Sequence, residues 1–243
     1  MTARLKSLAL ALVAPLLLWG CVVTPGKFVS TLTVNADRSF AFTYVGEVYA
    51  IDMGKEFTKG MGGSATESDA KETPTALQKI VWQDTAKADA AEEAERKNRA
   101  IAEALAKEAG YRKVEYVGGG KFVIDYAASG RLTHNFLFPF NSDAEVIFPF
   151  VMIELRGADR VRVKAPAFGE SSSGSKSAMG LPDTDSFSSK LDGIFTLTTD
   201  AEIVSQNNEN GPTTTGVTKV LSWKATPTTK DAPLAVLRLA SVP

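Results

Sequence analysis

Alternation of apolar and polar residues constrains this chain more than any other feature, because a period of two is that of a strand with one buried face. Residues 28–35 alternate in this way, with Phe28, Leu32 and Val34 on one face. Residues 39–51 alternate again after a turn at 35–38, so the two segments predict an opening β-hairpin. Residues 112–117 and 121–126 predict a second hairpin around the glycines at 118–120, and further strands are predicted over parts of 131–164, 194–204, 216–225 and 234–239.

One segment has helical character instead. Residues 86–109 are rich in alanine and end at Gly110. They hold four acid–base pairs spaced i,i+4, each worth about 0.2–0.5 kcal/mol in a helix: Glu92–Arg96, Glu93–Lys97, Glu95–Arg99 and Glu103–Lys107. The predicted fold class is therefore α+β, an antiparallel β-sheet of hairpins with one long helix packed against it.

Residues 28–243 are expected to form a single α+β domain, since the chain has one set of strands and no second core-forming segment. Two long segments are expected to be mobile loops. Residues 52–73 are polar and carry four glycines, and residues 166–193 carry eight serines with repeated glycine. Such compositions favour loops over packed structure.

The first twenty-one residues have the pattern of a targeting segment. Arg4 and Lys6 precede an apolar stretch over 7–18, which is shorter than the roughly 20 residues that a membrane span needs. Leu18-Trp19-Gly20-Cys21 follows and contains the only cysteine of the chain. This arrangement resembles the signal peptide and lipobox of bacterial lipoproteins, although Trp19 stands where that family carries a small residue. An ordinary secretory signal with an incidental cysteine is the alternative.

The lipoprotein resemblance implies a lipid anchor. Residues 1–20 would be the signal peptide, and Cys21 would carry the acyl chains, palmitate among them. Residues 21–27 would be the lipidated cysteine and its tether, whose six residues after Cys21 reach roughly 20 Å when extended. Val22 occupies the position where this family uses Asp for inner-membrane retention. The expected location is thus the outer membrane, facing the periplasm.

Composition excludes several partners and chemistries. Removal of Arg4 and Lys6 from 27 basic residues leaves 25 against 28 acidic ones, a net charge of −3, which gives no electrostatic case for nucleic acid. Acylation of Cys21 would leave no thiol for a disulfide, a nucleophile or a metal site. With His134 as the only histidine, no metal or cofactor is expected.

Candidate catalytic motifs each lack a required part. Residues 169–177 approach a phosphate-binding loop, but Ser175 separates Lys176 from the second glycine. The Ser173–Lys176 spacing of penicillin-binding enzymes lacks their Lys-Thr-Gly strand, and Phe187 and Ser188 spoil a calcium loop at 183–188. His134 has parity opposite to that of Asp125 and Ser129 in a strand. The chain is expected not to be an enzyme, with a hydrolase built on these residues as the less favoured alternative.

Phenylalanines gather in one segment of the chain. Phe138-Pro-Phe140 and Phe148-Pro-Phe150 repeat at a spacing of ten. Proline cannot donate to a sheet ladder, so each repeat should lie at a strand end, a bulge or an edge. Phe138, Phe140, Phe148 and Phe150 are therefore candidate binding residues at an apolar mouth, while a hairpin that contributes them to the core is the alternative.

Four segments extend the lipoprotein resemblance over most of the chain. They are Phe40-Ala-Phe-Thr-Tyr-Val-Gly-Glu47, Gly130-Arg-Leu-Thr-His134, Thr198-Thr-Asp-Ala-Glu-Ile203 and Leu221-Ser-Trp-Lys224. They resemble a group of uncharacterised proteobacterial envelope lipoproteins and, more loosely, LppM-like lipoproteins, whose fold resembles lipid-binding domains. The expected function is a non-catalytic, membrane-anchored lipoprotein that binds an apolar ligand or an envelope protein. A structural subunit of an envelope assembly is the alternative.

Overall fold

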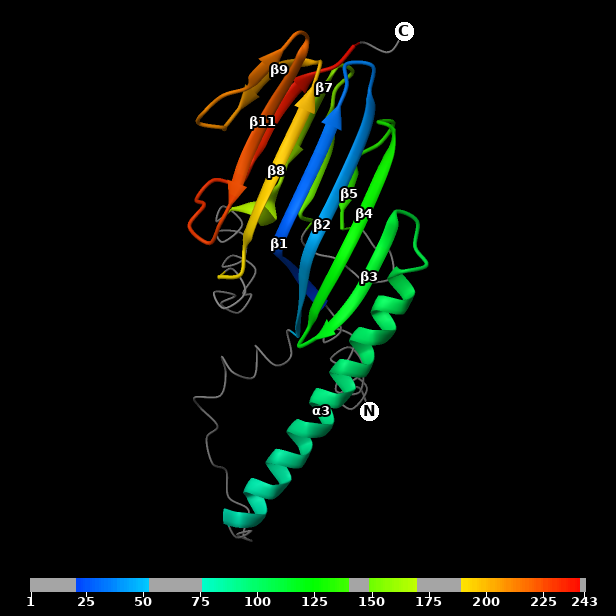
Figure 1. Cartoon of the computed structure of the whole chain (residues 1–243), viewed down its shortest axis with the longest axis vertical. Helices are drawn as coiled ribbons and strands as arrows, with labels where there is room; N and C mark the ends of the chain where they lie inside the picture. The colour runs from blue at the N-terminus through cyan, green and yellow to red at the C-terminus, as the bar shows by residue number, and fades with distance from the viewer. Residues whose placement is uncertain (1–20, 53–75, 140–148, 170–188, 241–243) are drawn as a thin grey trace, which may run out of the picture.

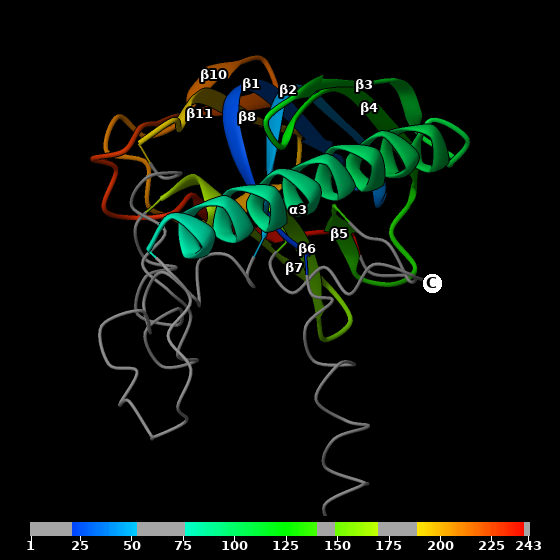
Figure 2. The same ribbon diagram turned by 90° about the horizontal axis from the view of Figure 1, so that it is seen from below.

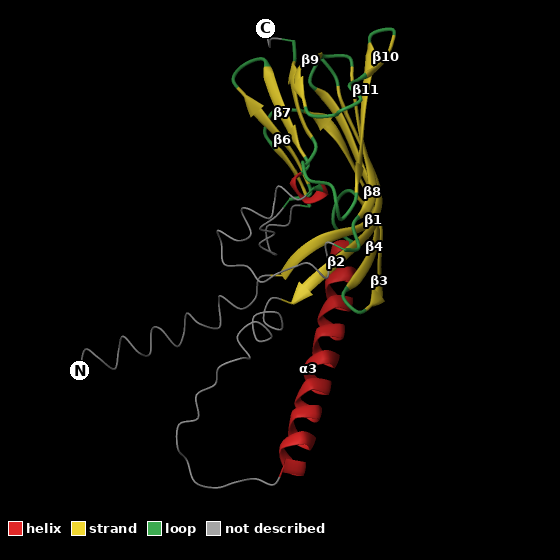
Figure 3. Cartoon of the chain, turned by 90° about the vertical axis from the view of Figure 1, so that its left-hand side faces the viewer, coloured by secondary structure: helices red, strands yellow, loops and turns green. Residues whose placement is uncertain are grey.

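The computed structural model of the chain describes residues 21–52, 76–139, 149–169 and 189–240. For residues 21, 22, 51, 52 and 76–90 only the backbone is described. The strands form two sheets, which Figure 3 shows edge-on as two layers that face each other.

The larger sheet has seven strands in the order β10-β11-β8-β1-β2-β4-β3. Their bounds are β1 Cys21–Val34, β2 Ser39–Asp52, β3 Tyr111–Gly118, β4 Lys121–Arg131, β8 Asp192–Thr199, β10 Thr213–Thr215 and β11 Thr218–Ala225. The neighbours are antiparallel except β1 and β8, which are parallel. The predicted hairpins over 28–51 and 112–126 are confirmed as β1–β2 and β3–β4.

The smaller sheet has five antiparallel strands in the order β5-β6-β7-β12-β9. They are β5 Phe136–Phe138, β6 Val151–Arg156, β7 Arg160–Lys164, β9 Glu202–Gln206 and β12 Leu234–Arg238. Seen from below, the two layers lie on opposite sides of the core (Figure 2). The short 3-10 helix η2 Pro166–Phe168 follows β7.

The core between the sheets is filled with aromatic rings, because the inward positions of both sheets carry phenylalanine and tyrosine. Tyr44 of β2 meets Phe138 of β5 with a centroid distance of 5.2 Å, and Phe28 of β1 stacks on Phe168 of η2 at 4.2 Å. Each fully buried aromatic side chain contributes several kcal/mol of hydrophobic stabilisation. The two sheets therefore stabilise each other through one continuous core.

The predicted fold class is wrong in its second layer. The helix α3 Ala76–Leu105 begins ten residues before the helical segment expected over 86–109 and ends within it, but it covers neither sheet. It runs from the β3 end of the large sheet away below the strands (Figure 1). Ala102 is buried against the core and Asn98 contacts the Tyr116 hydroxyl at 3.3 Å. An alanine-rich helix offers too little apolar surface to cover a sheet, so the small sheet does so and the fold is β-rich.

The structure describes the predicted tether and the ends of the two predicted loops. Residues 21–27 belong to β1, whose pairing with β2 runs from Cys21 opposite Asp52 and is interrupted only by a bulge between Pro25 and Phe28. The strand continues because Val23, beyond the bulge, still packs against the core. Phe168 and Leu191 are buried at the ends of the segment expected as a loop over 166–193. Residues 53–73 and 170–188 lie outside the described residues.

Candidate functional site

Cys21 is the first residue of β1, at the end of the large sheet that also carries the β3–β4 turn. Its backbone is in register with Asp52, the last residue of β2. An acyl group on Cys21 would therefore be attached directly to a strand of the folded sheet. No helix in the described part of the chain is long and apolar enough to cross a membrane.

The structure places the candidate binding phenylalanines unequally. Phe138 and Phe150 are 1% and 0% exposed, with ring centroids 6.0 Å apart in the core. They follow the alternative prediction, in which the hairpin gives its phenylalanines to the core. Phe140 and Phe148 lie outside the described residues. The predicted place of the prolines is confirmed, since β5 ends just before Pro139 and β6 begins just after Phe150.

The candidate catalytic residues do not form a catalytic set. His134 is exposed, and its Nδ1 lies 3.0 Å from the Thr133 hydroxyl. The Asp125 carboxylate faces Arg112, with a nitrogen–oxygen distance of 2.6 Å. Among the described residues, no three His, Cys, Asp or Glu side chains gather closely enough to hold a metal ion. The serine-rich segment with Ser173 and Lys176 lies outside the described residues.

A depression of about 410 Å³ lies on the large sheet toward the Cys21 end. Its lining includes Lys27, Glu47, Tyr49, Lys190, Asp192 and Pro227. Gly26, in the bulge of β1, makes room for the Tyr49 ring that lines this depression, because a Cβ on Gly26 would stand 2.5 Å from that ring. Only glycine at position 26 lets that ring lie across β1.

Glu47 is the centre of the hydrogen bonds beside this depression. Its carboxylate accepts a bond from Lys121 Nζ at 2.5 Å and one from the Tyr49 hydroxyl at 3.2 Å. Burial alone would raise the pKa of Glu47, but these donors and the Lys27 amide outweigh it and hold the pKa below its usual value. The ammonium of Lys190 lies 4.1 Å from the centre of the Tyr49 ring.

The outer face of the large sheet carries three uncharged rows of side chains, which we call the neutral face. The strand register places Val29 beside both Val45 and Ile194, and these are 56%, 48% and 47% exposed. The other two rows are Ser222, Thr196, Thr31, Thr43 and Ala127, then Val220, Thr198, Thr33, Ala41 and Ser129. Lys224 and Asp125 end the first row on opposite sides.

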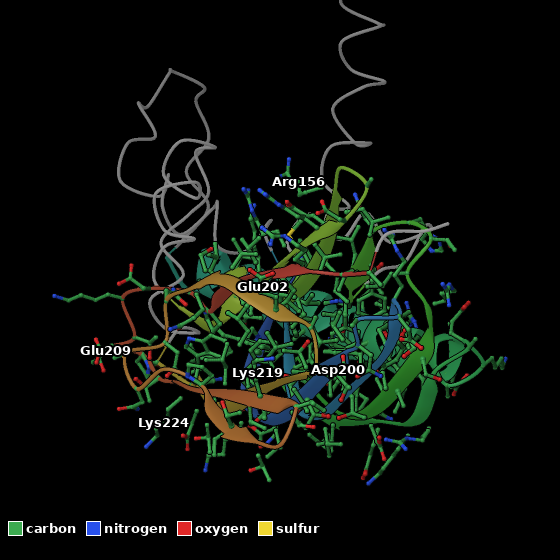
Figure 4. All side chains as sticks on the ribbon, turned by 90° about the horizontal axis from the view of Figure 1, so that it is seen from above. Arg156, Asp200, Glu202, Glu209, Lys219 and Lys224 are labelled. Carbon is green, nitrogen blue, oxygen red and sulfur yellow. The ribbon has the colours of Figure 1, made fainter. Side chains whose placement is uncertain are left out.

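The outer face of the small sheet is charged. Arg156, Arg160 and Arg238 occupy neighbouring positions on β6, β7 and β12, and we call them the arginine row. Arg162 lies two residues further along β7 on the same face. Arg156 and Lys224, labelled in Figure 4, lie on opposite sides of the molecule, one on each outer face.

Acidic residues form ion pairs with two members of the arginine row, Arg156 and Arg238. Glu154 accepts bonds from Arg156 Nη2 at 2.5 Å and from Lys164 Nζ at 3.0 Å. Burial raises the pKa of Glu154, but these two donors outweigh it and the pKa lies below its usual value. Glu202 holds Arg238 at 2.8 Å.

Sequence reasoning missed both the Glu47 cluster and the arginine row. Residues 160–164 were visible as a strand of alternating arginine, valine and lysine, which is the one available signal. The other members come from strands distant in sequence, since Arg156 pairs with Arg160 across a turn and Arg238 arrives from β12. Glu47 meets Lys121 only because β2 pairs with β4.

Comparison with known proteins adds little at this point. No protein-family model matches the chain, and no curated protein matches it. Among solved structures, the chain is similar to the NMR structure of the folded domain of the Mycobacterium tuberculosis LppM protein. The two share 16% sequence identity with a TM-score of 0.33, over 90% of this chain and 92% of that one. LppM is the protein to which the looser sequence resemblance pointed, and at this TM-score the likeness carries no argument about function.

Proposed function

We propose that the chain is a lipid-anchored, non-catalytic binding protein of the bacterial envelope, held on the outer membrane and facing the periplasm. The observation that carries the proposal is the position of the lipobox cysteine as the first residue of β1. Acylation there would leave no slack between lipid and fold, so the domain would stand at the membrane surface. The resemblance to proteobacterial lipoproteins is part of the same proposal.

The binding role is supported by the depression at the Cys21 end of the large sheet. The depression around Glu47 and Tyr49 is on the Cys21 side, where its charged side chains would meet lipid headgroups. An apolar ligand is supported only by the sequence pattern at Phe140 and Phe148, because Phe138 and Phe150 have no exposed surface to offer. A hydrolase has less support, because His134 and Asp125 have other neighbours.

Metabolic labelling tests the anchor. Cells grown with labelled palmitate should yield labelled protein that fractionates with the outer membrane. Two or more acyl chains bind a membrane stably, at about 0.8 kcal/mol per buried CH₂. Cys21→Ala should give an unlabelled chain that is soluble or keeps its first twenty residues. Wild-type protein without label would overturn the anchor.

A second candidate function, a structural subunit of an envelope assembly, is favoured by the neutral face. Across the sheet, its first row consists of Lys224, Ile194, Val29, Val45 and Asp125. The row is self-complementary, because Val29 of β1 stands at its centre and its two ends carry opposite charges. A twofold axis parallel to β1 would place Lys224 opposite Asp125 of a second copy and keep both anchors in one membrane. Asp125 also bonds Arg112 in its own chain, and Lys27, Glu47 and Asp192 border the face, so contact would be confined to the three rows.

Cross-linking tests this second candidate. Because Cys21 is the only cysteine, Thr31→Cys adds the sole free thiol of an acylated chain. Packed sheets lie about 10 Å apart, so a bis-maleimide of that reach should join two Thr31→Cys copies in membranes. Thr214→Cys, exposed on the edge strand β10, is the matched control and should stay monomeric. Equal cross-linking of both variants would count against the pairing.

A further inference from the structure

The arginine row is an arrangement that sheet stability alone does not favour. Arg160 lies directly opposite Arg156 on one side and Arg238 on the other. Like charges at directly opposed strand positions repel and destabilise the sheet. The outward positions of β6, β7 and β12 thus concentrate positive charge on a chain whose net charge is −1.

The members of this cluster differ in how far they are already paired. Arg156 is held by Glu154 at 2.5 Å, and Arg238 by Glu202 at 2.8 Å. Arg160 and Arg162 make no side-chain hydrogen bond or ion pair within the described residues. The N–H donors of these two guanidinium groups are therefore available to a ligand. Glu154 and Glu202 hold the flanking side chains, Arg156 and Arg238, in place.

We propose that Arg160 and Arg162, flanked by Arg156 and Arg238, bind a phosphate group of a soluble ligand. A guanidinium presents parallel N–H donors whose spacing matches two phosphate oxygens, and it stays charged at all relevant pH values. Arg160 and Arg162 are two residues apart on one strand face, which separates their Cα atoms by roughly 6.6 Å. That separation lets both side chains reach one phosphate or two linked ones.

The position of the row decides from which side the ligand comes. The Ala240 amide donates to the Ala36 carbonyl at 2.8 Å, and Arg38 of the same turn donates to the Ala158 carbonyl. The arginine row therefore lies at the β1–β2 turn, the end opposite Cys21. β1 has 14 residues, so this end is roughly 40 Å from the anchor. If Cys21 is anchored as proposed, the ligand approaches from the periplasmic side and not from the chain's own membrane; this step rests on the proposed function.

Titration with inorganic pyrophosphate tests the site on the mature full chain in detergent. Wild type should bind, with an affinity that falls as salt is raised. Arg160→Gln with Arg162→Gln should lose at least about tenfold in affinity, because both free guanidinium groups are removed. The control, Lys107→Gln with Lys230→Gln, removes the same charge from exposed sites elsewhere and should change affinity less than about twofold.

Four further measurements could refute the proposal or separate it from the anchor. Arg160→Lys with Arg162→Lys keeps the charge and should fall between wild type and the Gln pair; wild-type affinity there would overturn recognition by guanidinium forks. Equal loss in the Gln pair and its control, with unchanged thermal unfolding, would overturn the site. Competition by phosphatidylglycerol vesicles but not by phosphatidylcholine vesicles would overturn the soluble source. Palmitate label on the same sample reports the anchor separately, so pyrophosphate binding by an unlabelled chain would uphold the site and reject the anchor.

Discussion

The outer faces of the two sheets have opposite characters although their inner faces share one core. The neutral face of the large sheet holds threonine, serine, alanine and valine in register across five strands. The small sheet sets Arg156, Arg160, Arg162, Lys164 and Arg238 on its outer positions, with Glu154 and Glu202 between them. The two faces therefore differ in chemistry, with uncharged side chains on one side and guanidinium groups on the other.

This difference shows that the net charge of a chain does not report how charges cluster on the folded surface. A near-neutral chain gives no reason to expect an anion as a partner, because charges of both signs are summed over the whole sequence. Folding sorts them, and the arginine row forms only when β6, β7 and β12 pair. Interaction surfaces of β-proteins are better judged from strand register than from composition.

The largest effect is expected from breaking the core that supports both faces. Phe138→Ala should lower the free energy of unfolding by about 3–5 kcal/mol, because the ring is 1% exposed and contacts Phe42, Tyr44, Tyr126 and Phe150. Urea unfolding measures it. Val217→Ala, at a side chain 74% exposed, is the control and should change stability by less than about 0.5 kcal/mol.

The same experiment decides between core and binding surface for the repeated phenylalanines. Uptake of a fluorescent fatty acyl probe should be unchanged per folded molecule in Phe138→Ala. Phe140→Ala and Phe148→Ala test the sequence prediction of an apolar mouth, for which reduced uptake without loss of stability is expected. A stable Phe138→Ala protein that has lost uptake would contradict the core assignment.

The strands were largely predictable because alternation marks a half-buried strand. Phe28, Leu32 and Val34 identified the inner face of β1, and the turns at 35–38 and 118–120 identified both hairpins. Which layer covers the sheet was not predictable, because the alternation of β7 around Val161 and Val163 does not say which surface those residues meet. The alanine-rich helix had the stronger local signal and was given the wrong role.

The candidate sites were less predictable than the fold. Cys21 was predicted as a lipidation site from local sequence, because a lipobox is a contiguous pattern, and its acylation stays a prediction. Phe138 and Phe150 were placed at a surface because proline ends a strand, but a strand end can still point its side chain inward. The Glu47–Lys121 pair and the arginine row depend on contacts between strands, which a single sequence does not encode at any fixed spacing.

A smaller effect, expected on both faces, depends on pH. Glu154 on the charged face and Glu47 at the border of the neutral face each have a lowered pKa. A lowered folded pKa means that each contributes stability above the unfolded value of about 4.3, which is lost as pH falls through the folded pKa. Glu154→Gln should therefore cost about 1–2 kcal/mol at pH 7 and much less at pH 3.

Thermal unfolding of the Glu154→Gln and Glu47→Gln variants from pH 7 to pH 3 measures this convergence. Both variants should move toward wild type in acid, because the stability that each carboxylate contributes is lost as pH falls through its lowered folded pKa. Glu209→Gln, at an exposed site, is the control and should track wild type throughout. A gap between Glu154→Gln and wild type that stays constant down to pH 3 would show that packing, and not charge, determines the effect.

The smallest effect has the opposite sign and tests the arginine row most directly. Removal of the central charge by Arg160→Ala relieves repulsion from Arg156 and Arg238 and breaks no side-chain hydrogen bond or ion pair among the described residues, so stability should rise by about 0.2–1 kcal/mol. The gain should shrink as salt screens the charges. On the neutral face, Thr31→Ala removes the 2.6 Å hydroxyl contact with Thr43 and should lower stability slightly at every salt concentration. Chemical unfolding in urea, at low and high salt, measures both. If Arg160→Ala destabilised the protein as Thr31→Ala does, Arg160 would stabilise the fold. The proposed contrast between the neutral face and an anion-binding arginine row would then fail at the central residue of that row.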